Sequence, residues 1–153
     1  MQGRQAFVLA ALFAGSVAIA AEPVLPALKR QPSVQKVFDE HVDALNRCDW
    51  NRLMAQYPKD VEIHLPDGTV KKGRAQVGEL FAGFCKARPD GLKGLKFTAE
   101  SAFLVGNTLN VQWRADADFL SEPYKGSDAY VTRDGLMAAQ VTTFDGSKLK
   151  FKP

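Results

Sequence analysis

Hydrophobic and polar residues alternate over residues 109–119. The apolar positions are Leu109, Val111, Trp113, Ala115, Ala117 and Phe119, and the polar positions are Asn110, Gln112, Arg114, Asp116 and Asp118. A period of two over this length is typical of a half-buried antiparallel strand. We therefore expect one face of this strand to lie against a core, and that face fixes the register because a one-residue slip would expose it.

Helical patterns precede this strand. Apolar residues recur at helical spacing over residues 34–48, after Ser33 as a candidate N-cap, and again over residues 74–87. Between them, Asp49 is a candidate N-cap for a short helix that Pro58 ends. The first half of the chain is therefore predicted to contain three helices.

Strand patterns fill the rest of the chain. The other predicted strands are residues 61–65, 69–72, 92–105, 127–133 and 136–144. Asp134-Gly135 is a strong hairpin signal, and we expect the lysine-rich C-terminal end to be loose. Helices followed by a long antiparallel sheet indicate an α+β domain, which we assign to residues 33–153.

The N-terminal segment has a different character. Arg4 precedes an uncharged run over residues 6–21, and Ala18-Ile19-Ala20 supplies a small-x-small cleavage pattern. This order predicts a secretory signal peptide over residues 1–21, followed by a linker over residues 22–32. A membrane anchor is the alternative, but the run is shorter than the roughly 20 residues of a spanning helix. We expect a periplasmic or secreted protein, with no membrane partner after cleavage.

Export changes the interpretation of the only two cysteines, Cys48 and Cys85. In an oxidising compartment the pair predicts a disulfide, and two free buried thiols are the alternative. Neither the cysteines nor the two histidines have metal-ligand spacing, so we predict no metal and no cofactor. The net charge of +3 carries no dense basic stripe, which argues against a nucleic-acid partner.

Several short motifs complete the pattern. They are Ala44-Leu45-Asn46, Asp49-Trp50, Gly73-Arg74 and the Asp-x-Tyr-x-x-x-Asp-Gly run over residues 128–135. With the order of elements, they resemble the NTF2-like superfamily, in its SnoaL-like and ketosteroid-isomerase-like branch, over residues 34–144. The resemblance implies an NTF2-like cone, in which N-terminal helices pack on a curved antiparallel sheet around an apolar pocket. Such an architecture hosts many unrelated functions.

The resemblance also implies positions for an isomerase site. Leu65 stands where the family has its aspartate base, and His41 stands where it has a tyrosine on the first helix. Without the base, isomerisation by that mechanism is not expected. Asp128 matches the family's protonated acid, which in an apolar cone stays neutral and donates a hydrogen bond. We therefore predict catalytic or binding roles for His41 and Asp128, with a packed histidine and a solvated aspartate as the alternatives.

Three functions follow from these residues. The first is an exported pocket protein that binds a small apolar molecule. The residues expected at its ligand are Tyr57, Leu65, Trp113, Tyr130, Gln140 and Phe144, whereas His64 should point to the surface. The second is an isomerase, lyase or hydrolase that uses His41 and Asp128. The third is an interaction module that forms a homodimer through the open sheet face, where Asn110, Gln112 and Arg114 would lie.

Overall fold

The structure, a computed structural model, describes residues 24–153. The predicted signal peptide therefore lies outside the described residues, as do the first residues of the predicted linker. The helices are α1 (Val34–Arg47), α2 (Trp50–Met54) and α3 (Gly73–Phe84). The strands are β1 (Glu62–His64), β2 (Val70–Lys72), β3 (Lys96–Val105), β4 (Thr108–Asp116), β5 (Tyr124–Arg133) and β6 (Leu136–Thr142). A 3₁₀ turn, η1 (Gly146–Lys148), follows the last strand.

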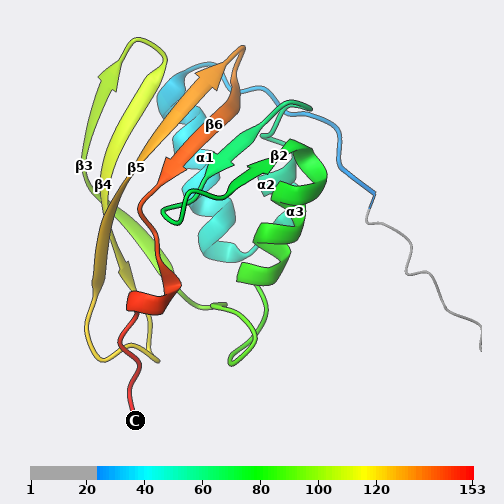
Figure 1. The fold of residues 1–153 in the computed structure, drawn as a ribbon. Helices are drawn as coiled ribbons and strands as arrows, with labels where there is room; N and C mark the ends of the chain where they lie inside the picture. Colours follow the sequence, from blue (N-terminus) through cyan, green and yellow to red (C-terminus); the bar gives the residue numbers. More distant parts are fainter. Residues whose placement is uncertain (1–23) are drawn as a thin grey trace, which may run out of the picture.

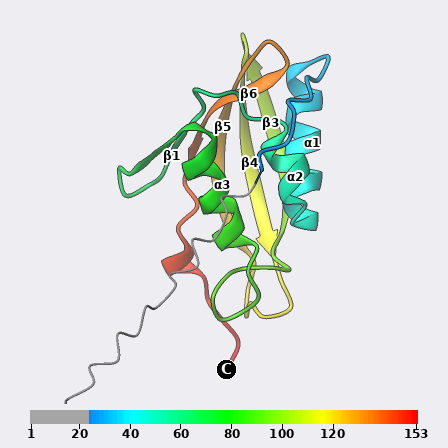
Figure 2. The same cartoon turned by 90° about the vertical axis from the view of Figure 1, so that its right-hand side faces the viewer.

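The helices cover one face of a single curved sheet, and this confirms the predicted α+β architecture (Figures 1 and 2). The six strands lie in the order β2-β1-β6-β5-β4-β3. Four of the five neighbouring pairs are antiparallel, but β1 runs parallel to β6. The sequence predicted a curved antiparallel sheet, and only the β1–β6 pair departs from it. The difference arises because β1 and β6 are far apart in the chain, so no hairpin sets their relative direction.

The alternation that predicted the central strand is confirmed in β4. Leu109, Val111, Trp113 and Ala115 are all buried on the face toward the helices. The strand ends at Asp116, so Ala117 and Phe119 lie beyond the predicted alternation in the following connection. Every second position of β4 is buried, so a shift of the strand by one residue would expose its apolar face.

Polar side chains set the ends of the helices. Ser33 caps α1 by accepting a hydrogen bond from the Lys36 backbone N–H at 3.2 Å, as predicted. At the other end of α1, the Asn46 amide bonds both backbone groups of Phe97, at 2.9 and 2.7 Å. Asn46 thereby fixes the end of α1 against the start of β3.

The predicted disulfide is present between Cys48 and Cys85. Cys48 is the C-cap of α1 and Cys85 is the C-cap of α3, which ends three residues before the predicted boundary at residue 87. The bridge joins the C-terminal ends of the two longest helices. Both helices lie over the same face of the sheet, and α2 packs against each of them (Figure 2).

Two further expectations concern the C-terminal half. Asp134 and Gly135 both have positive φ, at 52° and 73°, which is the turn expected between β5 and β6. The expectation of a loose lysine-rich end was wrong. Leu149 is buried, and the Ser121 N–H donates to the Lys150 carbonyl at 2.9 Å. Phe151 also pairs with Leu120, so the chain end is held by the connection between β4 and β5.

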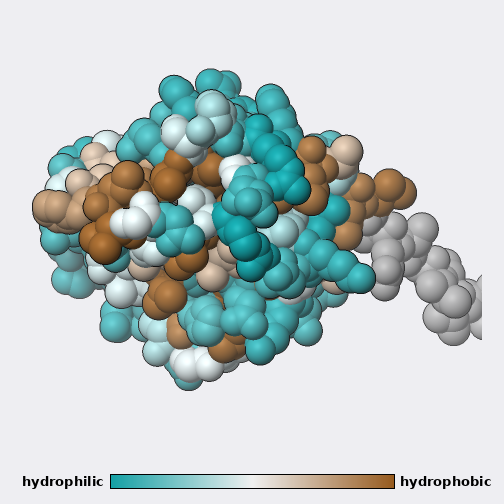
Figure 3. All heavy atoms as spheres, turned by 90° about the horizontal axis from the view of Figure 1, so that it is seen from above, coloured by the Kyte–Doolittle hydropathy of each residue, from teal (hydrophilic) through white to brown (hydrophobic). Residues whose placement is uncertain are grey.

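The outer face of the sheet carries exposed apolar side chains. At the β3–β4 hairpin, Phe103 and Val105 are 61% and 67% exposed on this face, whereas Leu104, 59% exposed, pairs with the buried Leu109 and lies on the other face. The strand register places Phe103, Asn110, Ala129 and Val141 side by side across β3, β4, β5 and β6, and we name this set the outer row. Figure 3, viewed from above, shows apolar surface at the end of the molecule where this hairpin lies.

Residues 24–32 contain no helix or strand and follow the surface of the domain. The Lys29 N–H donates to the Ala55 carbonyl and the Gln31 N–H to the Gly135 carbonyl, each at 2.8 Å. None of the helices within residues 24–153 has the length and apolarity needed to cross a bilayer.

Candidate functional site

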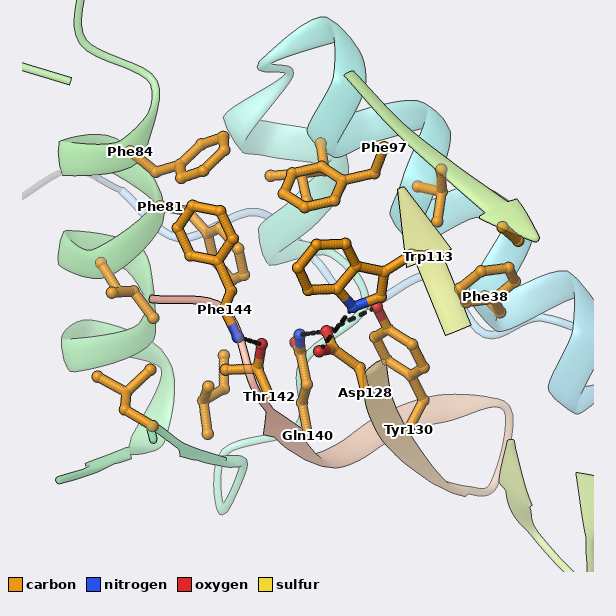
Figure 4. Close-up of a pocket in the computed structure, with 16 residues that line it drawn as sticks. Phe38, Phe81, Phe84, Phe97, Trp113, Asp128, Tyr130, Gln140, Thr142 and Phe144 are labelled. Carbon is orange, nitrogen blue, oxygen red and sulfur yellow. Dashed lines mark hydrogen bonds between the residues drawn. The ribbon is translucent and has the colours of Figure 1, made fainter. Parts of the chain in front are cut away.

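A cavity of about 130 Å³ lies between the helices and the inner face of the sheet (Figure 4). Its walls come from α1, β1, α3 and the strands β3 to β6. The lining residues are Phe38, Val42, Leu45, Ile63, Leu65, Leu80, Phe81, Phe84, Phe97, Ala99, Trp113, Asp128, Tyr130, Gln140, Thr142 and Phe144. A cavity of this size and apolarity suits a molecule with a single ring.

Asp128 is the one charged residue of this lining, and three side chains donate hydrogen bonds to it. The Trp113 indole Nε1–H donates to Oδ1 at 2.9 Å. The Tyr130 hydroxyl and the Gln140 amide donate to Oδ2, at 3.0 and 2.8 Å. Figure 4 shows these donors converging from β4, β5 and β6.

The hydrogen bonds give Asp128 a different character from the neutral acid that the resemblance implied. Each carboxyl oxygen receives an N–H, and neither the indole N–H of Trp113 nor the amide NH₂ of Gln140 can accept a hydrogen bond in return; of the three partners, only the Tyr130 hydroxyl can accept one. An ionised carboxylate only accepts, and bonds to an ionised group are the stronger ones. The geometry therefore fits a buried carboxylate that acts as an acceptor.

Gly126 makes room for the indole ring of Trp113. The two residues are opposite each other in β5 and β4. A Cβ at Gly126 would lie 2.4 Å from Cζ2 of that ring, and 2.7 Å from the Thr143 hydroxyl. A glycine inside a strand often marks such a close approach. Gly126 lies in β5 but outside the strand predicted over residues 127–133, so its role was not predicted.

Aromatic rings form the wall around Trp113. Its ring centroid is 5.3 Å from that of Phe97, in an edge-to-face arrangement, and 6.1 Å from that of Phe144. Phe84 from α3 completes the group, 6.0 Å from Phe144 and 6.1 Å from Phe97. These rings give the cavity a large apolar surface with polarisable faces.

His41 and Tyr57 lie one layer deeper than the cavity. Neither is among the lining residues, and both are completely buried. The Tyr57 hydroxyl and His41 Nδ1 are 3.1 Å apart, within hydrogen-bond distance. Tyr130 lies between His41 and Asp128. Its ring centroid is 5.4 Å from that of His41, and its hydroxyl donates to Asp128.

Burial holds these groups in their neutral forms. It lowers the pKa of His41 from 6.5 to about 4, because the charged imidazolium would lose its hydration. Burial also raises the pKa of Tyr57 and of Tyr130 well above 10, and the nearby negative charge of Asp128 adds to both shifts. His41 Nε2 has no hydrogen-bond partner within residues 24–153.

The structure brings together most of the residues that the sequence singled out. Asp128 and five of the six expected ligand contacts line the cavity; these five are Leu65, Trp113, Tyr130, Gln140 and Phe144. The side chain of His64 is 42% exposed and lies beside Glu62, outside the cavity. Within the described part of the chain, no three His, Cys, Asp or Glu side chains gather closely enough to hold a metal ion.

Comparison with known proteins gives a consistent assignment. The sequence profile of the SnoaL-like domain matches residues 38–140. No curated protein matches the sequence.

Solved structures share the fold at low sequence identity. An NTF2-like protein from Cytophaga hutchinsonii superposes with a TM-score of 0.61 at 14% identity, covering 78% of this chain and 96% of the other. A proposed ketosteroid isomerase from Kribbella flavida gives 0.61 at 18% identity, covering 78% and 81%. TerC, co-crystallized with polyporic acid, gives 0.62 at 18% identity, covering 74% and 92%. At these identities the likeness establishes the NTF2-like fold.

The buried His41 should make stability depend on pH. The pKa of His41 is lowered from 6.5 to about 4 in the folded protein. Between these two pH values, the histidine is protonated in the unfolded chain but not in the folded protein. The His41 contribution is complete above pH 6.5 and is lost as the pH falls to about 4. The free energy of unfolding should therefore drop by about 3 kcal/mol more than in His41→Phe over this range.

Urea unfolding of both proteins between pH 7 and pH 4 measures this difference. The carboxylates whose pKa is lowered by arginine, such as Asp60 and Asp43, are common to both proteins and cancel in the comparison. Equal pH slopes for the two proteins would show that His41 is not a buried neutral histidine.

Proposed function

The chain belongs to the SnoaL-like domain family, and we propose that it is an exported protein that binds a small apolar molecule in its cone. The observation that carries the proposal is the preformed cavity, whose aromatic and aliphatic walls surround one buried carboxylate. A concave apolar site with a few convergent polar groups is the usual form of a small-molecule site. The co-crystallization of TerC with polyporic acid supports a ligand in this fold.

Binding fits the lining better than the isomerase, lyase or hydrolase that we also considered. Leu65 lines the cavity at the position where the resemblance implies a base, and a hydrocarbon side chain cannot take a proton. Of the two residues in the enzyme hypothesis, only Asp128 reaches the cavity, because His41 lies behind the lining with a pKa lowered to about 4. A general base must reach the proton that it removes, directly or through one water.

Two features support export. The order of charge, apolar run and small residues over residues 1–21 is that of a signal peptide. The Cys48–Cys85 disulfide suits an oxidising compartment, such as the periplasm or the extracellular space.

Homodimer formation is a second candidate function, favoured by the outer row. Phe103 and Val141 are 61% and 49% exposed at its ends. Large exposed apolar side chains on an open sheet face often mark an interaction site, and here they flank Asn110 and Ala129. Asn110 and Gln112, which the sequence placed on this face, are also exposed, whereas Arg114 is half-buried and pairs with Asp116.

Gly126→Ala should impair ligand binding. The added methyl would displace the Trp113 indole, break its bond to Asp128 and narrow the cavity. With benzyl alcohol as a single-ring probe, calorimetric titration should show an affinity at least about tenfold below that of the unmodified protein, equivalent to about 1.4 kcal/mol.

Gly83→Ala is the matched control. A Cβ at this helical position meets nothing within 4 Å, so binding should be unchanged and stability should rise by roughly 0.5–1 kcal/mol. If benzyl alcohol binds Gly126→Ala as tightly as the unmodified protein, the cavity is not the binding site.

Export predicts a processed N-terminus. When the full chain is produced in a bacterium with a periplasm, the exported protein should begin at Ala21 or Glu22, because Ala18-Ile19-Ala20 provides the cleavage pattern. N-terminal sequencing of the periplasmic fraction reads this directly. A protein that retains Met1 or Gln2 in the cytoplasm contradicts export.

Phe103→Asp should abolish the dimer, because it replaces the most exposed apolar side chain of the outer row with a charge. Leu104→Asp is the matched control: Leu104 is almost equally exposed but pairs with the buried Leu109, so it lies on the other side of the hairpin. Sedimentation velocity should show a monomer for the first variant and a dimer for the second and for the unmodified protein. A monomeric unmodified protein at about 100 µM would refute the dimer, because interfaces of standard size bind more tightly than this.

A further inference from the structure

The charge of the cavity has no cationic partner in its walls. Asp128 is 8% exposed, and no Lys, Arg or His is among the lining residues. Its three donors, on Trp113, Tyr130 and Gln140, are all neutral groups. Hydrogen bonds from neutral donors stabilise a carboxylate, but they leave its net negative charge in place. A cation that entered the cavity would therefore meet an uncompensated charge in surroundings that screen it poorly.

Asp128 and Gln140 each keep an acceptor with spare capacity. Asp128 Oδ1 holds one hydrogen bond, whereas Oδ2 holds two, so Oδ1 can accept another. Gln140 Oε1 is buried and has no partner within residues 24–153, because the amide directs its NH₂ group at Asp128. A ligand that donates hydrogen bonds satisfies both atoms. A ligand carboxylate would instead place a second negative charge beside Asp128.

The aromatic wall also favours a positive charge. Trp113, Phe97, Phe144 and Phe84 form a continuous group of rings beside Asp128 (Figure 4). Ring faces attract cations, and tryptophan does so most strongly. An ammonium has three donors and no acceptor, so it matches both the acceptors and the rings.

We propose that the cavity binds amines, taken up as the ammonium ion and carried on a single aromatic or aliphatic ring. The nitrogen donates to Asp128 Oδ1 and Gln140 Oε1, and the ring occupies the apolar volume between α3 and the sheet. The cavity volume of about 130 Å³ limits the ligand to about one ring. This inference rests on the proposed function as a small-molecule binding protein and names the chemical class of its ligand.

Four probes that share one ring test the proposal: benzylamine, benzyl alcohol, toluene and benzoate. Calorimetric or NMR titration at pH 7 should give benzylamine an affinity at least tenfold above benzyl alcohol, and no binding of benzoate. Long-range attraction cannot produce this order, because the whole chain has a net charge of +3 and would favour the anion. In Asp128→Asn, the preference for the amine over the alcohol should fall to less than about threefold, because a charge-assisted bond is roughly twice as strong as a neutral one.

The outcomes separate the two proposals. If benzyl alcohol or toluene binds as tightly as benzylamine, the amine assignment is overturned and the binding function stands. If benzoate binds most tightly, Asp128 donates a proton to its ligand and the amine assignment is overturned as well. If no probe binds, the binding function fails and the amine assignment fails with it. Should Asp128→Asn not fold, the order of affinities in the unmodified protein decides the matter alone.

Discussion

The burial of one carboxylate is the constraint on which the rest of the sheet depends. Asp128 is bonded from β4, β5 and β6 at once, through Trp113, Tyr130 and Gln140. A one-residue slip of either neighbouring strand would turn its donor to the opposite face and leave a buried charge with too few partners, at a cost of several kcal/mol. Asp128 therefore selects one register for three strands, in addition to its proposed role in ligand binding.

Strand periodicity predicted the face of each cavity residue correctly but not its depth. Trp113 and Gln140 were assigned to the inner face by parity, and Asp128 by the family resemblance together with parity; all three line the cavity. His41 was assigned to a buried helical stripe, and it is buried, but a stripe is wide enough to hold both lining and fully covered positions. Which of them reaches the cavity depends on how Tyr130 packs beside it, and that contact joins elements far apart in the sequence.

The fold was predictable wherever short-range chemistry decides it. Ser33 and Asp134-Gly135 fix a helix start and a hairpin within a few residues, and both were recognised from the sequence. The parallel pairing of β1 with β6 and the docking of Phe151 on Leu120 depend on segments that meet only in the folded chain. No local pattern encodes such pairings, which is why the direction of β1 and the order of the C-terminal end escaped prediction.

The Cys48–Cys85 bridge has a consequence for selectivity. It joins the ends of α1 and α3, and these helices supply facing parts of the cavity wall, including Phe38 and Phe84. If only packing held the two helices, they could move apart to admit a wider ligand, but the disulfide at their ends resists that movement. The width of the ligand that fits is thus limited by a disulfide that does not contact the ligand. In a reducing environment, the two helices would be free to move apart.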